Sequence, residues 1–209
     1  MIGTSSFQHK LAYGEMGEKL ITRFKRNEGF LILPAYEKEY QTGKGPRLFM
    51  PLGCEHEKLI APDMLAKRAK EIFWIEAKHK SHFTWYAKTG HWQTGIDERH
   101  YHDYLKVMEH TLWDTWLYFL HTDDTPPRGK WANGINGYNP QPLHCPTGLF
   151  GRSLTELKFF VDHTAPYVDE ITGRSYPMVY WDYEDLEELA TLEQVLAASA
   201  QNSITKGKS

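Results

Sequence analysis

The longest apolar runs of this chain are short and strand-like, and this constrains its fold more than any other feature. The run Glu71–Lys78 (EIFWIEAK) is typical, and every such run falls far below the roughly 20 residues needed to cross a bilayer. At 209 residues, a single domain can bury roughly 70% of the surface of its unfolded chain. We therefore expect a globular chain with its own core, no structural disulfide and no membrane-spanning segment.

The charge balance excludes a protein coated uniformly in positive charge. The formal net charge is -3, from 24 Lys plus Arg against 27 Asp plus Glu. A local basic site beside clustered carboxylates stays compatible with this balance. The N-terminus has no apolar segment typical of a secretory signal, and two lone cysteines suit a reducing compartment, so we expect a cytoplasmic protein, in the host cytoplasm if it is phage-encoded.

The first half of the chain has the periodicity of one helix followed by three strands. Met16, Leu20, Ile21 and Phe24 follow helical spacing, and Gly29 suits the end of that helix. The helix is predicted over Gly14–Asn27, and the strands over Phe30–Tyr36, Lys58–Asp63 and Glu71–Lys78. Leu65–Lys70 is predicted as a basic connection, which would make the three strands a meander.

A hairpin, a helix and a further strand are predicted next. Phe83–Ala87 and His91–Thr94 flank a turn at Lys88–Gly90, and Asp97 is a good N-cap. The helix behind Asp97 should bury one face, made of Tyr101, Tyr104, Leu105, Met108 and Leu112. Trp116–His121 is the next strand, so the order is α-β-β-β-α-β with an inserted aromatic hairpin, a mixed α/β arrangement.

The final third of the chain begins with a long Pro- and Gly-rich segment, 122–151. Ser153 and Glu156 have capping-box spacing before Leu157–Val161, Met178–Trp181 suits a strand, and the leucines from Leu186 to Leu196 suit a closing helix. We therefore divide the chain into a core, 1–121, and a loop-rich extension, 122–209, packed on the same domain.

One constellation carries chemistry. Pro62-Asp63 ends one predicted strand, and Glu76-Ala77-Lys78 ends the next after 12 intervening residues. Because side chains alternate along a strand, Glu76 and Lys78 share a face while Ala77 points the other way. Buried charges need each other or a ligand, and two carboxylates suit Mg²⁺, which prefers oxygen ligands. The alternative is a solvated strand end.

These residues resemble the signature of the PD-(D/E)XK nuclease superfamily. The resemblance spans about 14–121 and implies a restriction-endonuclease-like core, with a central mixed β-sheet flanked by helices. It also implies that Asp63 and Glu76 bind Mg²⁺, for which Mn²⁺ substitutes, that the Ala77 carbonyl completes the metal shell, and that Lys78 orients water or stabilises phosphate charge. Glu18 on the first helix would assist the metal, with Glu15 as the weaker alternative.

By this resemblance, the chain is a metal-dependent deoxyribonuclease in which a metal-activated water hydrolyses phosphodiester bonds, in repair, recombination or a phage or mobile element. The partner is DNA. Two questions stay open: whether the protein is a monomer or a homodimer, and whether it is an endonuclease or an exonuclease. Basic and aromatic residues near the site suit phosphate contacts and base stacking. The candidate nucleic-acid-binding residues are Lys80, His82, Trp85, Lys88, His91, Arg99 and His100.

Two other functions fit the sequence. A catalytically silent relative could bind nucleic acid through the basic hairpin. A zinc-stapled interaction protein would instead use two thiols and two imidazoles, which suit tetrahedral Zn²⁺. Its candidate ligands are Cys54, His56, His144 and Cys145.

Overall fold

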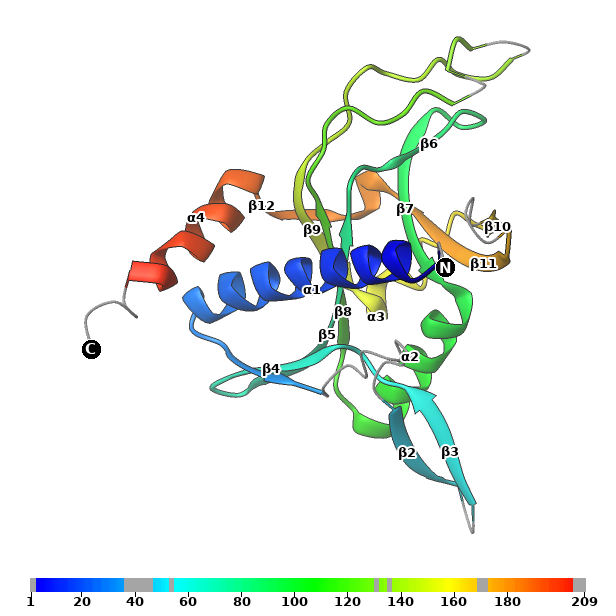
Figure 1. The fold of residues 1–209 in the computed structure, drawn as a ribbon. Coiled ribbons are helices and arrows are strands. Elements are labelled where there is room, and N and C mark those ends of the chain that lie inside the picture. The colour runs from blue at the N-terminus through cyan, green and yellow to red at the C-terminus, as the bar shows by residue number, and fades with distance from the viewer. Residues whose placement is uncertain are drawn as a thin grey trace.

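The computed structural model describes residues 3–35, 47–52, 55–129, 132–134, 137–168 and 173–204 (Figure 1). In these ranges none of the helices is long and apolar enough to cross a membrane. The helical elements are α1 (Gly3–Asn27), α2 (Glu98–Thr111), α3 (Leu154–Leu157), η1 (Tyr183–Asp185) and α4 (Leu192–Ile204).

A six-stranded sheet forms the centre of the molecule, in the order β1-β4-β5-β8-β9-β12. Its central strands β5 and β8 run parallel, and the other neighbours pair antiparallel, so the sheet is mixed. The strands are β1 (Leu31–Pro34), β4 (Met64–Arg68), β5 (Glu71–Lys80), β8 (Thr115–His121), β9 (Gly148–Ser153) and β12 (Glu187–Ala190). A central mixed sheet flanked by helices confirms the predicted fold class.

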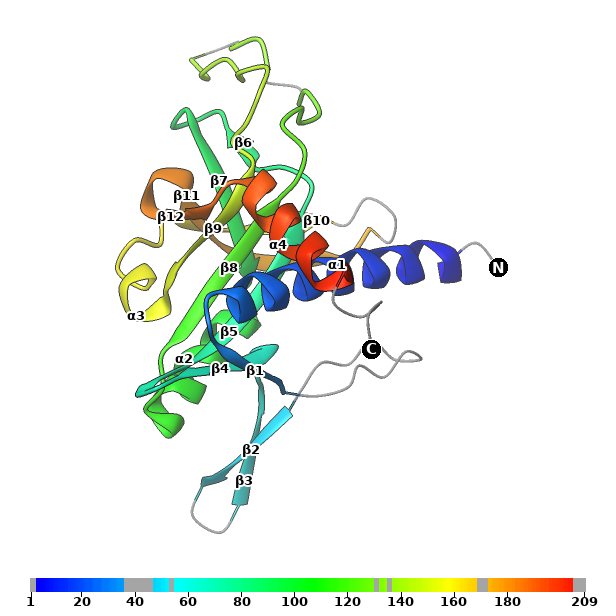
Figure 2. The ribbon, with the colours of Figure 1, turned by 90° about the vertical axis from the view of Figure 1, so that its left-hand side faces the viewer.

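A second sheet and a ribbon extend from this centre. The second sheet has the order β10-β11-β7-β6, and the ribbon pairs β2 with β3 (Figures 1 and 2). The hairpin β6–β7 is the predicted aromatic hairpin. The bounds are β2 (Arg47–Leu52), β3 (Glu55–Ile60), β6 (Thr84–Tyr86), β7 (His91–Asp97), β10 (His163–Val168) and β11 (Ser175–Asp182).

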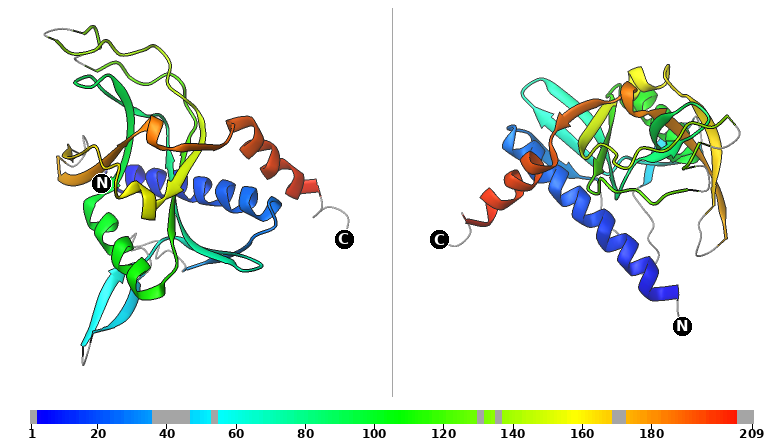
Figure 3. Two further views of the ribbon diagram at one scale, coloured as in Figure 1. Left: turned by 180° about the vertical axis from the view of Figure 1, so that it is seen from behind. Right: turned by 90° about the horizontal axis from the view of Figure 1, so that it is seen from above.

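Helices α1 and α2 cover opposite faces of the central sheet, as the views from the front and from behind make clear (Figures 1 and 3). On the α1 face, Leu20 and Ile21 pack with Ile75 and Ala77 of β5 in one buried cluster. The other face carries a second cluster, in which Tyr104 of α2 joins Leu117 and Phe119 of β8. Alternation along β5 and β8 therefore places neighbouring side chains on opposite faces of the sheet.

The region after residue 121 completes the central sheet. Strands β9 and β12 extend it beyond β8, and α4 packs beside α1. The Arg23 guanidinium donates a hydrogen bond to Ser199 Oγ at 2.6 Å, and the Asn27 amide donates to the Ala198 carbonyl at 3.2 Å. The predicted extension 122–209 therefore shares the core of residues 1–121.

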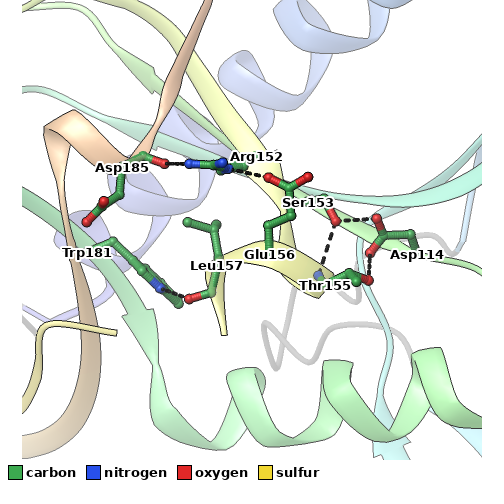
Figure 4. Close-up of polar contacts among 8 residues, drawn as sticks. All are labelled: Asp114, Arg152, Ser153, Thr155, Glu156, Leu157, Trp181 and Asp185. Carbon is green, nitrogen blue, oxygen red and sulfur yellow. Dashed lines mark hydrogen bonds and ion pairs between the residues drawn. The ribbon is translucent and has the colours of Figure 1, made fainter. Parts of the chain in front are cut away.

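A polar network fixes the short helix α3 to the sheet (Figure 4). The Asp114 carboxylate accepts hydrogen bonds from the hydroxyls of Ser153 and Thr155, the latter at 2.9 Å. Ser153 Oγ in turn accepts from the Thr155 backbone N–H at 3.1 Å, so Ser153 is the N-cap of α3. Arg152 pairs with Glu156 at 2.6 Å beside it. These side chains satisfy one another, so the network has a structural role.

Several predicted elements were wrong. The segment Leu65–Lys70, expected as a connection, lies largely within β4, and β4 rather than β3 is the antiparallel neighbour of β5. The closing helix expected from Leu186 begins only at Leu192, because the preceding residues form β12. The residue Leu112, expected on the buried face of α2, is its left-handed C-cap and is 88% exposed.

Candidate functional site

Asp63 lies in the bend just before β4, and its position follows from the register of the sheet. Pairing between β4 and β5 ends at Met64 and Ile75, so the N–H of Ala77 has no partner in β4. The Asp63 carboxylate accepts a hydrogen bond from that N–H at 2.9 Å. Asp63 is therefore held beside Glu76, although it follows the bend rather than ending a strand.

Glu76 and Lys78 project from the same face of β5, as the alternation predicted. Glu76 is only 1% exposed, and its Oε1 forms an ion pair with the Lys78 ammonium. The second oxygen, Oε2, is buried and has no hydrogen-bond partner in the described ranges. The Lys78 side chain retains 30% of its exposure, so the site opens to solvent on the side of the lysine.

The electrostatics of Lys78 bring Glu18 into the same site. Burial acts to lower the pKa of the Lys78 ammonium, but the negative charges of Glu76, Asp63 and Glu18 outweigh burial and raise the pKa above its ordinary value. Lys78 is therefore a cation at neutral pH. The carboxylate of the alternative residue, Glu15, instead lies 3.8 Å from the ammonium of Lys19, one turn along α1.

A close approach between α1 and β5 positions Glu18. A Cβ at Gly17 would lie 2.3 Å from the Cβ of His79, so only glycine lets the helix lie this close to the strand. One turn earlier, the Tyr13 ring stacks on His79 with 3.7 Å between ring centroids, and His79 Nδ1 lies 2.7 Å from the Tyr13 carbonyl. Sequence reasoning missed these contacts, although a glycine inside a helical pattern is a signal for close packing.

Lys80, predicted to contact nucleic acid, is instead engaged inside the protein. Its ammonium donates a hydrogen bond to the Gly95 carbonyl at 2.6 Å and lies 5.7 Å from the centre of the Phe119 ring. Burial, together with the charge of Lys78, lowers the pKa of Lys80 to about 7. Lys80 shares a face with Glu76 and Lys78, and its hydrogen bond to Gly95 connects it to β7.

Two histidines lie at the carboxyl ends of β5 and β8: His82 follows β5, and His121 is the last residue of β8. His121 pairs in register with Lys80, is fully buried and stacks on Phe83 at 3.6 Å. Neither of its ring nitrogens has a hydrogen-bond partner in the described ranges, and burial with the nearby Lys80 charge lowers its pKa to about 2. The pKa of His82, predicted to contact nucleic acid, is likewise lowered by burial.

The remaining candidates for nucleic-acid binding form two separate groups. Trp85, Lys88 and His91 lie on the hairpin, and Lys88 is exposed at its turn. Arg99 and His100 begin α2, at the far end of β7. The six-residue rise of β7 separates the two groups by about 20 Å. The structure brings the hairpin residues together and leaves those of α2 apart.

The alternative zinc site receives no support from the described residues. Cys145 is buried, and its thiol donates to the Asp123 carbonyl at 3.4 Å, while His144 Nδ1 lies 3.1 Å from Asp124. Cys54 and the side chain of His56 lie outside what the structure describes. In the described ranges, no three His, Cys, Asp or Glu residues are grouped so that they could bind a metal ion. Metal binding by Asp63, Glu76 and Glu18 therefore stays a prediction.

Comparison with known proteins gives a likeness among solved structures. No family model matches the sequence. No curated protein matches it at a significant level either. Among solved structures, a Holliday junction resolvase, Hjc from Archaeoglobus fulgidus, is similar over 84% of this chain and 91% of its own, with 8% sequence identity and a TM-score of 0.45. A likeness at this TM-score carries no argument about family or function, so the resemblance to PD-(D/E)XK nucleases stays a prediction.

Proposed function

We propose that this protein is a divalent-metal-dependent nuclease that hydrolyses phosphodiester bonds of DNA in recombination, repair or a mobile element. The observation that supports this most directly is the environment of Lys78. The Lys78 ammonium pairs with Glu76 and lies within electrostatic reach of Asp63 and Glu18, beside a Glu76 oxygen that has no hydrogen-bond partner among the described residues. A strand that only packs against the core does not require a buried carboxylate and an ammonium on one of its faces.

The donor set fits Mg²⁺ or Mn²⁺. A buried carboxylate oxygen without a hydrogen bond is costly, and a cation relieves that cost. Hard divalent cations are typically bound by one or two carboxylates and keep several waters for substrate phosphate. Asp63 and Glu76 would bind the ion, with the Ala77 carbonyl and Glu18 completing or supporting its shell. When bound, such an ion supplies a hydroxide near neutral pH and neutralises phosphate charge.

The chain's own residues would do the rest. The N–H of Ala77 holds the Asp63 carboxylate in one orientation, so the ligand is fixed before metal or substrate arrives. The charged Lys78 has solvent access, so it would contact a phosphate oxygen and stabilise the negative charge that develops there. A preorganised cation in a partly buried site is far more effective than one in water.

A cleavage assay tests the proposal. Purified protein is incubated with linear, circular, single-stranded and branched DNA in Mg²⁺, Mn²⁺ or EDTA, alongside Glu76→Gln. The matched control is Glu71→Gln on the same strand, since Glu71 is exposed and pairs with Arg68. We expect cleavage that requires metal, is lost in Glu76→Gln and survives in Glu71→Gln.

The other outcomes distinguish the alternatives. DNA binding without cleavage in any metal would identify a silent nucleic-acid-binding relative. Metal-independent cleavage, or full cleavage by Glu76→Gln, would contradict the proposed site.

A further inference from the structure

A cavity of about 310 Å³ lies between the β6–β7 hairpin and the loop that follows β8. The two segments stand side by side at one end of the molecule (Figures 1 and 2). Aromatic rings, a lysine and a buried amide line the cavity. The lining includes Trp85, Tyr86, Lys88, Ala132, Tyr138 and Gln141.

Hydrogen bonds join the two walls of this cavity. The indole N–H of Trp85 donates to the Asn139 carbonyl at 3.1 Å, and the backbone N–H of Asn139 donates to the Ala87 carbonyl at 2.7 Å. At the hairpin turn, a Cβ on Gly90 would lie 2.9 Å from Asn139 Cγ, so turn and loop are in contact. The walls are therefore linked to each other without a ligand.

The loop wall is also braced from within. The buried Gln141 amide donates to the Pro127 carbonyl at 3.2 Å and accepts from the Gly129 N–H at 3.3 Å. Its backbone N–H donates to the Ala132 carbonyl at 3.0 Å. Gln141 thus ties Pro127, Gly129 and Ala132 to one another, and a cavity whose wall is already held by such bonds costs less ordering when a ligand binds.

The size and chemistry of the cavity select a flat, aromatic ligand carrying negative charge. Its volume lies near the lower end of the range for small-molecule sites, about 300–1,000 Å³, which excludes a duplex and fits one nucleoside. Tyr and Trp side chains stack on any base, and the exposed Lys88 at the rim is placed to meet a phosphate. We propose that this cavity binds one unpaired base of a nucleic acid strand.

This inference rests on the proposed function only in that the ligand is nucleic acid. The cavity is separate from Glu76 and Lys78 but close to them along the chain. The segment from Lys78 to Trp85 can span at most roughly 25 Å, so the cavity lies within a few nucleotides of the candidate metal site. A strand with an unpaired base in the cavity would be presented to that site, and the protein would prefer single-stranded or branched DNA.

The test measures binding and cleavage separately. A single-stranded oligonucleotide with one 2-aminopurine, and its duplex, are titrated in EDTA with the wild type, Tyr138→Ala, Tyr138→Phe and Lys88→Ala. Circular dichroism confirms that each variant is folded. Lys70→Ala is the matched control, since Lys70 is exposed at the turn between β4 and β5. Cleavage of duplex in Mg²⁺ is recorded for the same proteins.

The wild type should quench 2-aminopurine on the single strand, and Tyr138→Ala should weaken that binding about tenfold or more, while Tyr138→Phe retains it. Lys88→Ala should lower the salt slope by about 0.7, and Lys70→Ala should leave it unchanged. The cavity assignment is overturned if Tyr138→Ala binds the single strand as tightly as the wild type does. It is also overturned if Tyr138→Ala loses as much affinity for the duplex as for the single strand. The binding titrations in EDTA do not depend on cleavage. A failure of the nuclease proposal would therefore appear only in the cleavage assay.

Discussion

The two faces of β5 differ in what each requires of its residues. On the α1 face, Ile75 and Ala77 are buried among apolar side chains, and any well-packed hydrophobic set would serve there. On the other face, Glu76, Lys78 and Lys80 place ionisable groups in buried or partly buried positions, where unpaired charge is costly. Both faces belong to the same strand. Packing of the apolar face therefore holds β5 rigid, and this rigidity fixes the positions of the charged side chains on its other face.

The largest effect should follow from removing the charge of Lys78. Lys78→Ala leaves Asp63 and Glu76 to bind the ion but removes a preorganised cation, so single-turnover cleavage should fall about a hundredfold to a thousandfold. Metal-dependent DNA binding should survive, whereas Asp63→Ala should lose both. Near-wild-type cleavage by folded Lys78→Ala protein would show that the charged face has no chemical role.

The opposite face should respond in stability rather than in chemistry. Ile75 is fully buried against α1, so Ile75→Ala should lower the free energy of unfolding by about 2–5 kcal/mol, and Ile75→Val by about 0.5–1.5 kcal/mol. Denaturant unfolding measures both. Below its denaturation midpoint, Ile75→Val should cleave like the wild type, and a hundredfold loss of turnover would break the comparison.

The contact between α1 and β5 can be tested with two glycines of one helix. Gly17→Ala would bring a Cβ within 2.3 Å of His79, so we expect a loss of about 1–3 kcal/mol of stability. Among the described residues, a Cβ at Gly14 would meet no neighbouring side chain or strand within 4 Å, so Gly14→Ala should be neutral or stabilising by about 0.5–1 kcal/mol. Equal thermal shifts in the two variants would contradict the close approach.

The stability of the protein should also depend on pH, because His121 of β8 is buried beside Lys80 of the charged face. Burial and the Lys80 charge lower its folded pKa from 6.5 to about 2, so between these values the unfolded chain binds a proton that the folded chain does not. This contribution is fully present above pH 6.5 and decreases as pH falls toward 2. Each pH unit in that window should cost about 1.4 kcal/mol.

The measurement is urea unfolding of wild type and His121→Phe from about pH 7 to about pH 4. His121→Phe removes the titrating ring and suits the aromatic surroundings, so its stability should fall less steeply with acid. His110→Ala is the control, because His110 is exposed on α2. The same slope in His121→Phe as in the wild type would exclude His121 as the source.

Local signals in the sequence predicted the elements that surround the candidate site. The alternation of Glu71–Lys78, the N-cap at Asp97 and the turn at Lys88–Gly90 each place an element correctly, because neighbouring residues decide those structures. The shared face of Glu76 and Lys78 followed from period two alone. The roles of these residues stay predictions until the experiments above are done.

Long-range pairing decided what the sequence did not predict. Lys67 and Arg68 look like a connection, yet they lie in β4 because Met64 and Ala66 alternate into the core beside β5. The segment Glu187–Ala190 has helical composition, but pairing with β9 makes it a strand, so tertiary contacts override local propensity. The orientation of Lys80 likewise depends on Gly95, which is 15 residues away.

The packing of α4 on α1 has a consequence for how the chain folds. Arg23 and Ser199 are 176 positions apart, and the central sheet joins strands from both halves of the sequence. Pairings of such high contact order close slowly. During synthesis, one edge of β8 stays unpaired until β9 has been made. Unpaired strand edges are prone to aggregation. We therefore expect the newly made chain to depend on chaperones until α4 has left the ribosome.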